Sequence, residues 1–599
     1  MIDMNLLDYS NPNSSCQAVA QFSVAIFLDL CVPKSCSGSK DLTELGRAVA
    51  IRGNRPVCTA DSIIEQGRKK NYQTWIVVAV LVAIGIVAAC GTIFDYFGSS
   101  ALKSRYSKNK WIQCMLAFSV YTNICQIFDT TNVNKPGQIG PIHFMRLISM
   151  CWVVLGHVSV MTISVSGNTL DTIKGFKDVS TGFLTNSYFS VDTFFFMSGL
   201  LLGFVWFKGY YRNPKRQLST QAWIMFYVHR FLRLSPPYYL VIAFYTFVFN
   251  TFVIHMPNLL MGYKDSCDRN WWINLLYLTN YIDYKNQCYL ISWYLATDIQ
   301  MYIFAPVILI PLAIKPLYGF ITAAGIFIAS TAGNMITVYR YYFPPSDFSF
   351  GAQDPRMKDF NVYTLMMYDA PWIRCQVYII GILTGYLLQT RKKLRIPFLV
   401  NIALWIISLG LGLTVILVLK DWVNGKLLSL TESAFYSAFS RIAWGLALAY
   451  ITASCYYGYG GPINRFMSWS IWAPFGRLTY CGYLVHVMVV FYMLGMGDSQ
   501  IIYTNFSYTF VTTTLPGIVF TFFFALFWSA LFEIPTAKVE GILLGGLRGR
   551  ETVKQKPESD NSVTVRRVTV NETPVILNPP KVIEETATTV EKDSSVEKL

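Results

Sequence analysis

Residues 143–160 read HFMRLISMCWVVLGHVSV and carry a clear signal of the fold class. It is mostly apolar and, with the residues that follow it, covers the roughly 20 residues that an α-helix needs to cross a bilayer. Backbone polar groups in lipid must be paired within their own segment, so the stretch is predicted to be a helix and not a strand. It also holds Arg146 and His157, whose side chains are costly inside lipid and need an explanation.

Comparable apolar stretches recur on both sides of this one. The predicted spans are residues 75–94, 146–165, 188–207, 231–254, 290–312, 317–338, 372–390, 397–419, 434–456, 475–495 and 509–532. Segments 231–254 and 290–312 are less regular, because both contain proline and polar residues. The chain is therefore predicted to be all-α, a polytopic transmembrane helical bundle of about eleven spans.

The composition excludes an ordinary soluble fold. Of the 599 residues, 53% are hydrophobic and only 14% are charged, which is more apolar side chain than soluble domains of this length bury. The formal net charge of +15 does not indicate a nucleic-acid partner, since Lys and Arg lie in short runs between apolar segments. The thirteen cysteines include neither a CxxC pair nor a Cys/His cluster, so we predict no metal site. No bound cofactor is expected either.

The basic runs indicate how the chain is oriented. KSRYSKNK at 103–110, KGYYRNPKR at 208–216 and RKKLR at 391–395 fall in alternate loops, whereas the opposite loops mix acids and bases. Cytosolic loops of membrane proteins carry such an excess of Lys and Arg. We therefore expect a multi-pass protein of the plasma membrane or endoplasmic reticulum, with its N-terminus outside or lumenal and its C-terminus in the cytosol.

Residues 1–70 are polar and carry four cysteines, and residues 1–20 lack the basic start and continuous apolar core that a signal peptide needs. An even number of cysteines beside a span predicts two disulfides in an oxidising compartment, with three possible pairings. Four unpaired thiols in a cytosolic segment are the alternative. These cysteines are Cys16, Cys31, Cys36 and Cys58.

Two further features agree with an external N-terminus. Cys267 and Cys288 share one predicted outer loop and are expected to pair, and sequons predict glycans on Asn13 and Asn505. At the other end, residues 533–599 are rich in Lys, Glu, Thr, Val and Ser and have hardly any aromatic residues. They are predicted to form a disordered cytosolic tail.

Arg146 and His157 are the leading candidates for a functional site. Eleven helical steps return to within ~20° of the starting direction and rise ~16 Å, so both side chains point from one helix face. An imidazole kept neutral in the membrane suits a general base for a hydroxyl group, and a guanidinium suits phosphate or an anionic carbonyl oxygen. Taken singly, Arg146 is equally well a snorkelling residue and His157 a packed histidine.

Other ionisable or polar residues in predicted spans suggest a polar interior that binds substrate or donor. Asp192 is expected to orient an imidazole, pair with an arginine or cap its helix. Arg230 and Arg233, one turn apart, suit either phosphate or lipid headgroups. The remaining candidates for substrate or donor binding are Asp298, Gln300, Arg374 and His486.

Taken in order, these segments resemble the acyltransferase-3 superfamily, and more closely its animal branch of nose-resistant-to-fluoxetine-like proteins. The CVPKSC segment is similar to the cysteine-rich extracellular domain of that branch. Six ordered motifs over some 350 residues carry the resemblance: R-x10-H at 146–157, DxFFFMSG at 192–199, RxxRLxPxYY at 230–239, WYLxxDxQ at 293–300, RxxxYxxGxxxGY at 374–386 and LTYxxYLxH at 478–486.

The resemblance implies a division of the chain. Residues 1–70 would be part of the extracellular domain, 75–97 a first transmembrane helix and 98–142 a cytosolic linker. Residues 143–532 would be the acyltransferase-3-like transmembrane domain of ten helices, followed by the tail. The family's extracellular domain is normally longer and follows a signal peptide, so the chain is expected to be N-terminally truncated.

The resemblance also implies an activity. The protein would move an acyl group from a cytosolic donor, with acyl-CoA as co-substrate, to a hydroxyl of a lipid or other acceptor. His157 would be the general base, Arg146 would bind the donor or stabilise an oxyanion, and Asp192 is the third candidate catalytic residue. Membrane lipids, the donor and the acceptor would be its partners.

Two other functions remain as alternatives. Because animal members of the family are also associated with movement of lipids and hydrophobic drugs, a carrier with the same fold is the main alternative. A scaffold whose cysteine-rich head binds a partner is a weaker one.

Overall fold

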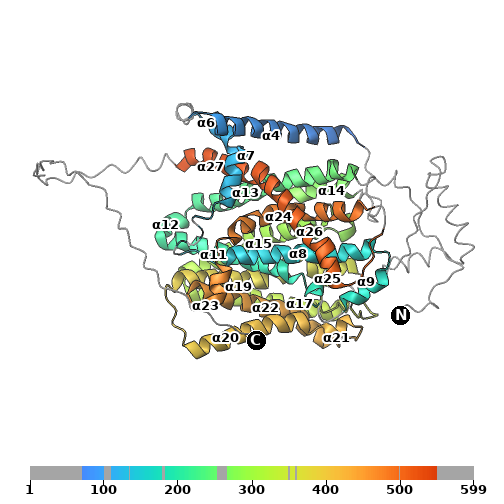
Figure 1. The fold of residues 1–599 in the computed structure, drawn as a ribbon. Helices are drawn as coiled ribbons and strands as arrows, with labels where there is room; N and C mark the ends of the chain where they lie inside the picture. The colour runs from blue at the N-terminus through green and yellow to red at the C-terminus, as the bar shows by residue number, and fades with distance from the viewer. Residues whose placement is uncertain are drawn as a thin grey trace, which may run out of the picture. The chain divides into compact units, whose positions relative to one another are not determined.

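Long α-helices form nearly all of the described structure, a computed structural model (Figure 1). It describes residues 70–99, 109–131, 133, 135, 137–177, 182–252, 266–347, 351–357, 360–497 and 500–548. In these residues extended pairing is limited to one isolated bridge between Ser166 and Ile501. The chain divides into two units after Gly545, and the helical bundle belongs to the first. The all-α prediction is therefore confirmed for the described residues.

The long helices follow the apolar stretches of the sequence. They are α4 (Tyr72–Phe97), α8 (Ile142–Val165), α11 (Phe189–Arg212), α13 (Thr220–Phe247), α15 (Trp293–Phe304), α16 (Pro306–Ile314), α17 (Pro316–Tyr341), α19 (Pro371–Thr390), α20 (Phe398–Leu417), α22 (Leu430–Tyr456), α24 (Trp472–Gly495), α26 (Leu515–Trp528) and α27 (Ile534–Arg548).

Shorter helices connect them. They are α6 (Lys110–Ala117), α7 (Val120–Phe128), α9 (Thr169–Phe176), α10 (Gly182–Thr185), α12 (Pro214–Gln217), α14 (Ser266–Leu275), α18 (Phe360–Tyr363), α21 (Lys420–Val423), α23 (Gly461–Met467) and α25 (Phe506–Thr509). Three π-helical turns, Thr364–Tyr368, Phe510–Thr514 and Ser529–Glu533, continue neighbouring helices.

Eight helical segments of the described chain are long and apolar enough to cross a membrane, or nine if the bent pair α6 and α7 counts as one crossing. The other three predicted spans correspond to α13, α19 and α22. These helices are also long, but arginine inside each lowers its hydropathy. A membrane helix that contains arginine is expected to turn its polar face toward the interior of the bundle, away from lipid.

Two sequence predictions need correction at their boundaries. The supposed linker 98–142 contains α6 and α7, which meet at an angle of 58°. The last helical segment runs on through α27 to Arg548, so the predicted disordered tail does not begin at 533. Asn123 of α7 holds this segment in place, because its Nδ2 donates to the Ala530 carbonyl at 2.9 Å and its Oδ1 accepts from Lys538 at 2.6 Å.

Predictions for the outer loops are partly testable. Cys267 and Cys288 form the expected disulfide. Asn505 is exposed and its side-chain oxygen caps α25, which leaves its amide nitrogen free of that bond. Its glycosylation stays a prediction. Asn13 and the first four cysteines lie outside the described residues.

The helices that carry the candidate residues lie in the interior of the bundle. Figure 1 shows α8, α11, α15 and α24 between α4 at one edge and α20 at the other. Few of the side chains of α4 and α20 are buried inside the protein, as expected for helices that face lipid. The α24 and α8 helices pack together, as do α11 and α19. The polar residues of these inner helices therefore meet one another.

Glycines bring α11 and α19 into direct backbone contact. A Cβ atom at Gly199 of α11 would lie 2.2 Å from the Tyr378 carbonyl oxygen, and one at Gly385 of α19 would lie 2.4 Å from the Leu200 carbonyl oxygen. Small residues permit such close approach between membrane helices. This contact fixes where Asp192 and Arg374, near the ends of the two helices, face each other.

Gly199→Ala should lower stability, because the added methyl group collides with rigid backbone and overpacking costs about 1–3 kcal/mol. The melting temperature of the purified protein in detergent measures this. Gly333→Ala is the matched control, since a Cβ there meets no atom within 4 Å. Equal melting temperatures for Gly199→Ala and Gly333→Ala would contradict the close-contact interpretation.

Candidate functional site

Two imidazoles face each other between α8 and α24. The rings of His157 and His486 lie 4.9 Å apart between centroids, and Nδ1 of His157 lies 3.4 Å from Nε2 of His486. His486 is fully buried, whereas His157 remains partly exposed. The structure thus brings together two residues that the sequence placed on different predicted spans.

Backbone carbonyls fix the tautomers of both rings. Nδ1 of His157 lies 2.9 Å from the Val153 carbonyl oxygen, and Nδ1 of His486 lies 2.8 Å from the Tyr483 carbonyl oxygen. A carbonyl oxygen only accepts, so each Nδ1 carries the hydrogen and each Nε2 carries a lone pair. The lone pair of His486 faces the N–H of His157. The Nε2 atom of His157 makes no hydrogen bond with any described residue, so its lone pair is available to a ligand.

Arg146, near the start of α8, has fewer polar contacts than the two histidines. Arg146 makes no hydrogen bond or ion pair within the described residues, although it interacts electrostatically with Arg233, Arg230, Tyr294 and Glu533. Arg233 is exposed. Guanidinium groups without a carboxylate at ion-pair distance are suited to an anionic ligand.

Arg230 differs from the other two arginines because it has a partner. Its Nη2 atom forms an ion pair with Asp298 Oδ2 and donates to Ser198 Oγ at 3.4 Å. The Asp298 side chain is only 4% exposed, and the guanidinium also lies over the Tyr302 ring at 4.8 Å. Two residues predicted separately to bind substrate therefore form one ion pair.

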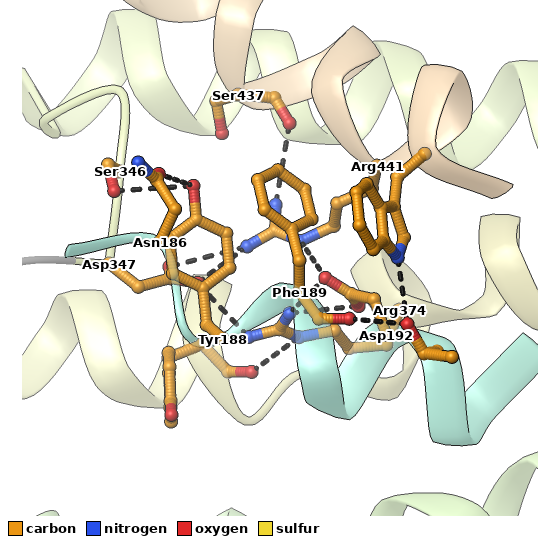
Figure 2. Close-up of polar contacts among 12 residues, drawn as sticks. Asn186, Tyr188, Phe189, Asp192, Ser346, Asp347, Arg374, Ser437 and Arg441 are labelled. Carbon is orange, nitrogen blue, oxygen red and sulfur yellow. Dashed lines mark hydrogen bonds and ion pairs between the residues drawn. The ribbon is translucent and has the colours of Figure 1, made fainter. Parts of the chain in front are cut away.

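A second polar centre joins α11, α19, α22 and the loop after α17 (Figure 2). Arg374 donates to both oxygens of Asp192 at 3.0 and 3.1 Å and to Asp347 at 3.2 Å. Arg441 donates to Asp347 at 2.9 Å and lies 3.6 Å from Asp192. We call these four residues the ion-pair cluster.

The ion-pair cluster is buried and electrically balanced. Its four side chains are between 0 and 4% exposed, with two positive and two negative charges. Burial alone would raise the pKa of Asp347, but the guanidinium groups of Arg441 and Arg374 hold that pKa below its usual range. Every charge therefore has an opposite charge within hydrogen-bonding or ion-pair distance.

This arrangement bears on two predicted roles. Asp192 pairs with arginine, one of the alternatives left open by the sequence, and it makes no hydrogen bond to either imidazole. Arg374, predicted to bind substrate or donor, has all its nitrogens directed at Asp192, Asp347 and the Tyr368 carbonyl. The geometry favours a structural role for both.

Gln300 is also fully engaged. It exchanges two hydrogen bonds with Asn280, at 2.8 and 2.9 Å, and donates to the carbonyl of Tyr277, whose φ of 56° is unusual for a side chain of its size. It therefore holds a loop against α15, and the structure does not favour the predicted substrate contact.

Sequence reasoning missed Asp347 and Arg441. Arg441 lies well inside the predicted span 434–456, and a lone arginine there requires a carboxylate partner in the bundle. That rule could have identified Arg441. Asp347 lies in a loop, in the stretch PPSDFSF, and no local pattern marks it.

Comparisons with known proteins agree with the motifs. Residues 140–534 match the acyltransferase-3 family, described as an acyltransferase domain. The chain is 28% identical to "Nose resistant to fluoxetine protein 6" of Caenorhabditis elegans over 576 residues, which cover 90% of this chain and 68% of that protein. It is 24% identical to "Regulator of hypoxia-inducible factor 1" of the same organism over 377 residues, 60% of this chain and 72% of that protein. No solved structure matches.

Arg374→Met should destabilise the protein by about 3–5 kcal/mol, because it leaves buried carboxylates without their partner. Adding Asp192→Leu should restore part of the loss, since Asp347 and Arg441 then remain as a balanced pair. Lys426→Met is the control, as it breaks an ion pair whose side chains are 70% and 65% exposed. Melting temperatures and the amount of protein in membranes report the effects. If the double variant is less stable than Arg374→Met alone, the loss of charge balance does not explain the destabilisation.

Asp369 should make stability depend on pH. Burial raises the pKa of Asp369 to about 7. The hydrogen bond that Gln287 donates to its carboxylate lowers the pKa, but by less than burial raises it. Between about pH 4 and 7 the folded chain holds a proton that the unfolded chain releases, so stability should fall as pH rises through this range. Asp369→Asn should reduce the difference in melting temperature between pH 5 and pH 8. The exposed Asp421→Asn should leave it as in the wild type.

Proposed function

The chain belongs to the acyltransferase-3 family, and from this premise we propose that it is an O-acyltransferase. It moves an acyl group from a cytosolic donor such as acyl-CoA to a hydroxyl group of a lipid or other acceptor, with His157 as general base. The observation that carries the proposal is the imidazole pair, in which His157 has a defined tautomer and an unbonded Nε2.

The proposed step uses that nitrogen. As the hydroxyl oxygen attacks the thioester carbonyl of the donor, Nε2 of His157 takes the hydroxyl proton. A carbon–oxygen bond forms, the carbon–sulfur bond breaks, and the proton passes from His157 to the leaving sulfur. His486 is a positioning residue, because its Nε2 faces Nδ1 of His157 and helps to hold the ring in the required tautomer.

The arginines at the other end of α8 suit the donor. Arg146 and Arg233 have no carboxylate at ion-pair distance among the described residues, and they lie on the side that the basic loops predict to be cytosolic. A nucleotide-bearing donor supplies several phosphate charges, for which guanidinium groups offer paired hydrogen bonds. Arg146 would then hold donor phosphate or stabilise the negative oxygen of the tetrahedral intermediate.

His157→Ala should reduce acyl transfer by about 10²–10⁴-fold, the usual effect of losing a general base. Removing one polar side chain from a membrane helix contact costs only ~0.6 kcal/mol on average, so membrane abundance should hardly change. The assay follows labelled acyl groups from acyl-CoA into lipids, with purified protein in lipid nanodiscs.

Arg146→Lys should also impair transfer, because an ammonium group cannot reproduce the planar two-donor contact of guanidinium. Arg391→Lys, an exposed loop substitution, is the matched control and should remain active. If the His157→Ala and Arg146→Lys proteins both reach the membrane with full biological activity, the transferase proposal is wrong. A carrier that uses the polar interior without a base would then be the better account.

A further inference from the structure

Three buried polar atoms around Arg230 have no hydrogen-bond partner among the described residues. They are Nε of Arg230, Oδ1 of Asp298 and the hydroxyl oxygen of Tyr378. The residues come from α13, α15 and α19. Asp298 and Tyr378 are 4% and 2% exposed, whereas Arg230 is 27% exposed, so the group is enclosed but open along the arginine.

The Arg230–Asp298 ion pair, the Arg230–Ser198 hydrogen bond and electrostatic interactions with Tyr378 indicate that the three residues are neighbours. Arg230 interacts with both Asp298 and Tyr378. Tyr378 lies beside Ser198, which accepts a hydrogen bond from Arg230, but the tyrosine hydroxyl does not itself reach hydrogen-bonding geometry. Buried polar atoms are normally paired, and a lone one costs roughly 1–3 kcal/mol. Three such atoms on neighbouring residues leave hydrogen-bonding capacity for a polar group of a ligand.

The three atoms restrict the chemistry of that group. Arg230 Nε–H only donates, an ionised Asp298 only accepts, and the Tyr378 hydroxyl does either. An ionised carboxylate accepts only, so it would leave Asp298 Oδ1 unpaired. Either a carboxylate or a phosphate would also place a second negative charge beside Asp298. The charge of Arg230 is already balanced by Asp298. A neutral hydroxyl group accepts from Arg230 and donates to Asp298, and so satisfies both.

We propose that Arg230, Asp298 and Tyr378 form a subsite for a neutral hydroxyl group of the acceptor. The assignment of this hydroxyl to the acceptor rests on the proposed function. The proposed subsite gives the two arginines of the RxxR motif different roles. Arg230 binds the acceptor, and Arg233 is available to bind the anionic donor. Tyr378 becomes a binding residue that no sequence prediction had named.

Aromatic side chains connect this subsite to the imidazole pair. Tyr294 interacts electrostatically with Asp298, Arg230 and Arg146. Its ring lies 5.2 Å from that of Tyr483, which in turn lies 6.0 Å from the His486 ring. Two tyrosines therefore connect the subsite to the imidazole pair, and the proposal requires an acceptor long enough to reach from one to the other.

Thermal stabilisation tests the subsite without any acyl transfer. A ligand that binds the folded protein raises its melting temperature in a saturable way. The probes are glycerol at millimolar concentration and monoacylglycerol, which present the same hydroxyl groups free or on a lipid, together with inorganic phosphate and coenzyme A. Purified wild-type protein, Tyr378→Phe and Asp298→Asn are compared, with Tyr386→Phe on the same helix as control.

Glycerol, monoacylglycerol or both should stabilise the wild type, and which of them does so identifies the source of the hydroxyl. Tyr378→Phe should weaken that binding about three- to tenfold, the usual effect of losing one hydrogen bond. Tyr386→Phe should bind as the wild type does. Coenzyme A should stabilise wild type and Tyr378→Phe equally, and phosphate should not compete with the hydroxyl probes.

Either of two results would overturn the proposal. One is that neither hydroxyl probe gives a shift that Tyr378→Phe weakens, which would mean that only water fills the site. The other is evidence that the site binds an anionic group: phosphate competes with glycerol or monoacylglycerol, or Tyr378→Phe loses coenzyme A binding. If the hydroxyl probes bind as expected but no donor yields acyl transfer, the subsite stands and the proposed transferase function fails.

Discussion

A charged side chain carried into a membrane bundle must find its counter-charge inside the protein, and this constraint organises the structure. Lipid offers neither water nor ions to a buried guanidinium, so each arginine of the inner helices determines which helices can be neighbours. Arg374 and Arg441 show the effect most directly. Their shared carboxylates, Asp192 and Asp347, tie three helices and a loop together in a cluster without exposed charge.

The same constraint separates polar residues that hold the bundle together from those left for a ligand. In the ion-pair cluster and around Gln300, most donor and acceptor positions are filled by neighbouring residues. Around Arg146, Arg230 and Nε2 of His157 they are not. A polar residue in a span is therefore weak evidence for function by itself. What distinguishes a candidate site is the hydrogen-bonding capacity that remains after the protein's own contacts are counted.

The sequence predicted the helices well because their signal is local. Apolar length and the position of charges gave the helical segments, the R-x10-H face and the Cys267–Cys288 pair. The contacts between side chains of different helices could not be predicted in this way. Nothing near Asp192 in the sequence reveals that it meets Arg374, 182 residues away, and nothing near His157 reveals His486. Such pairs depend on which helix faces touch. The glycines of the contact between α11 and α19 belong to the motifs DxFFFMSG and RxxxYxxGxxxGY, but neither motif reveals which helix it meets.

The two arginines of the RxxR motif illustrate why spacing alone cannot assign roles. Residues three apart on a helix differ in direction by about 60°, enough to place one toward the bundle and the other toward its surface. Arg230 turns inward and is neutralised by Asp298 on α15, whereas Arg233 is exposed. A neutralised guanidinium loses most of its attraction for phosphate but keeps its directed N–H groups. In the proposed function the contribution of Arg230 would then be geometric, and the charge needed for an anionic donor would come from the arginines that α15 does not reach.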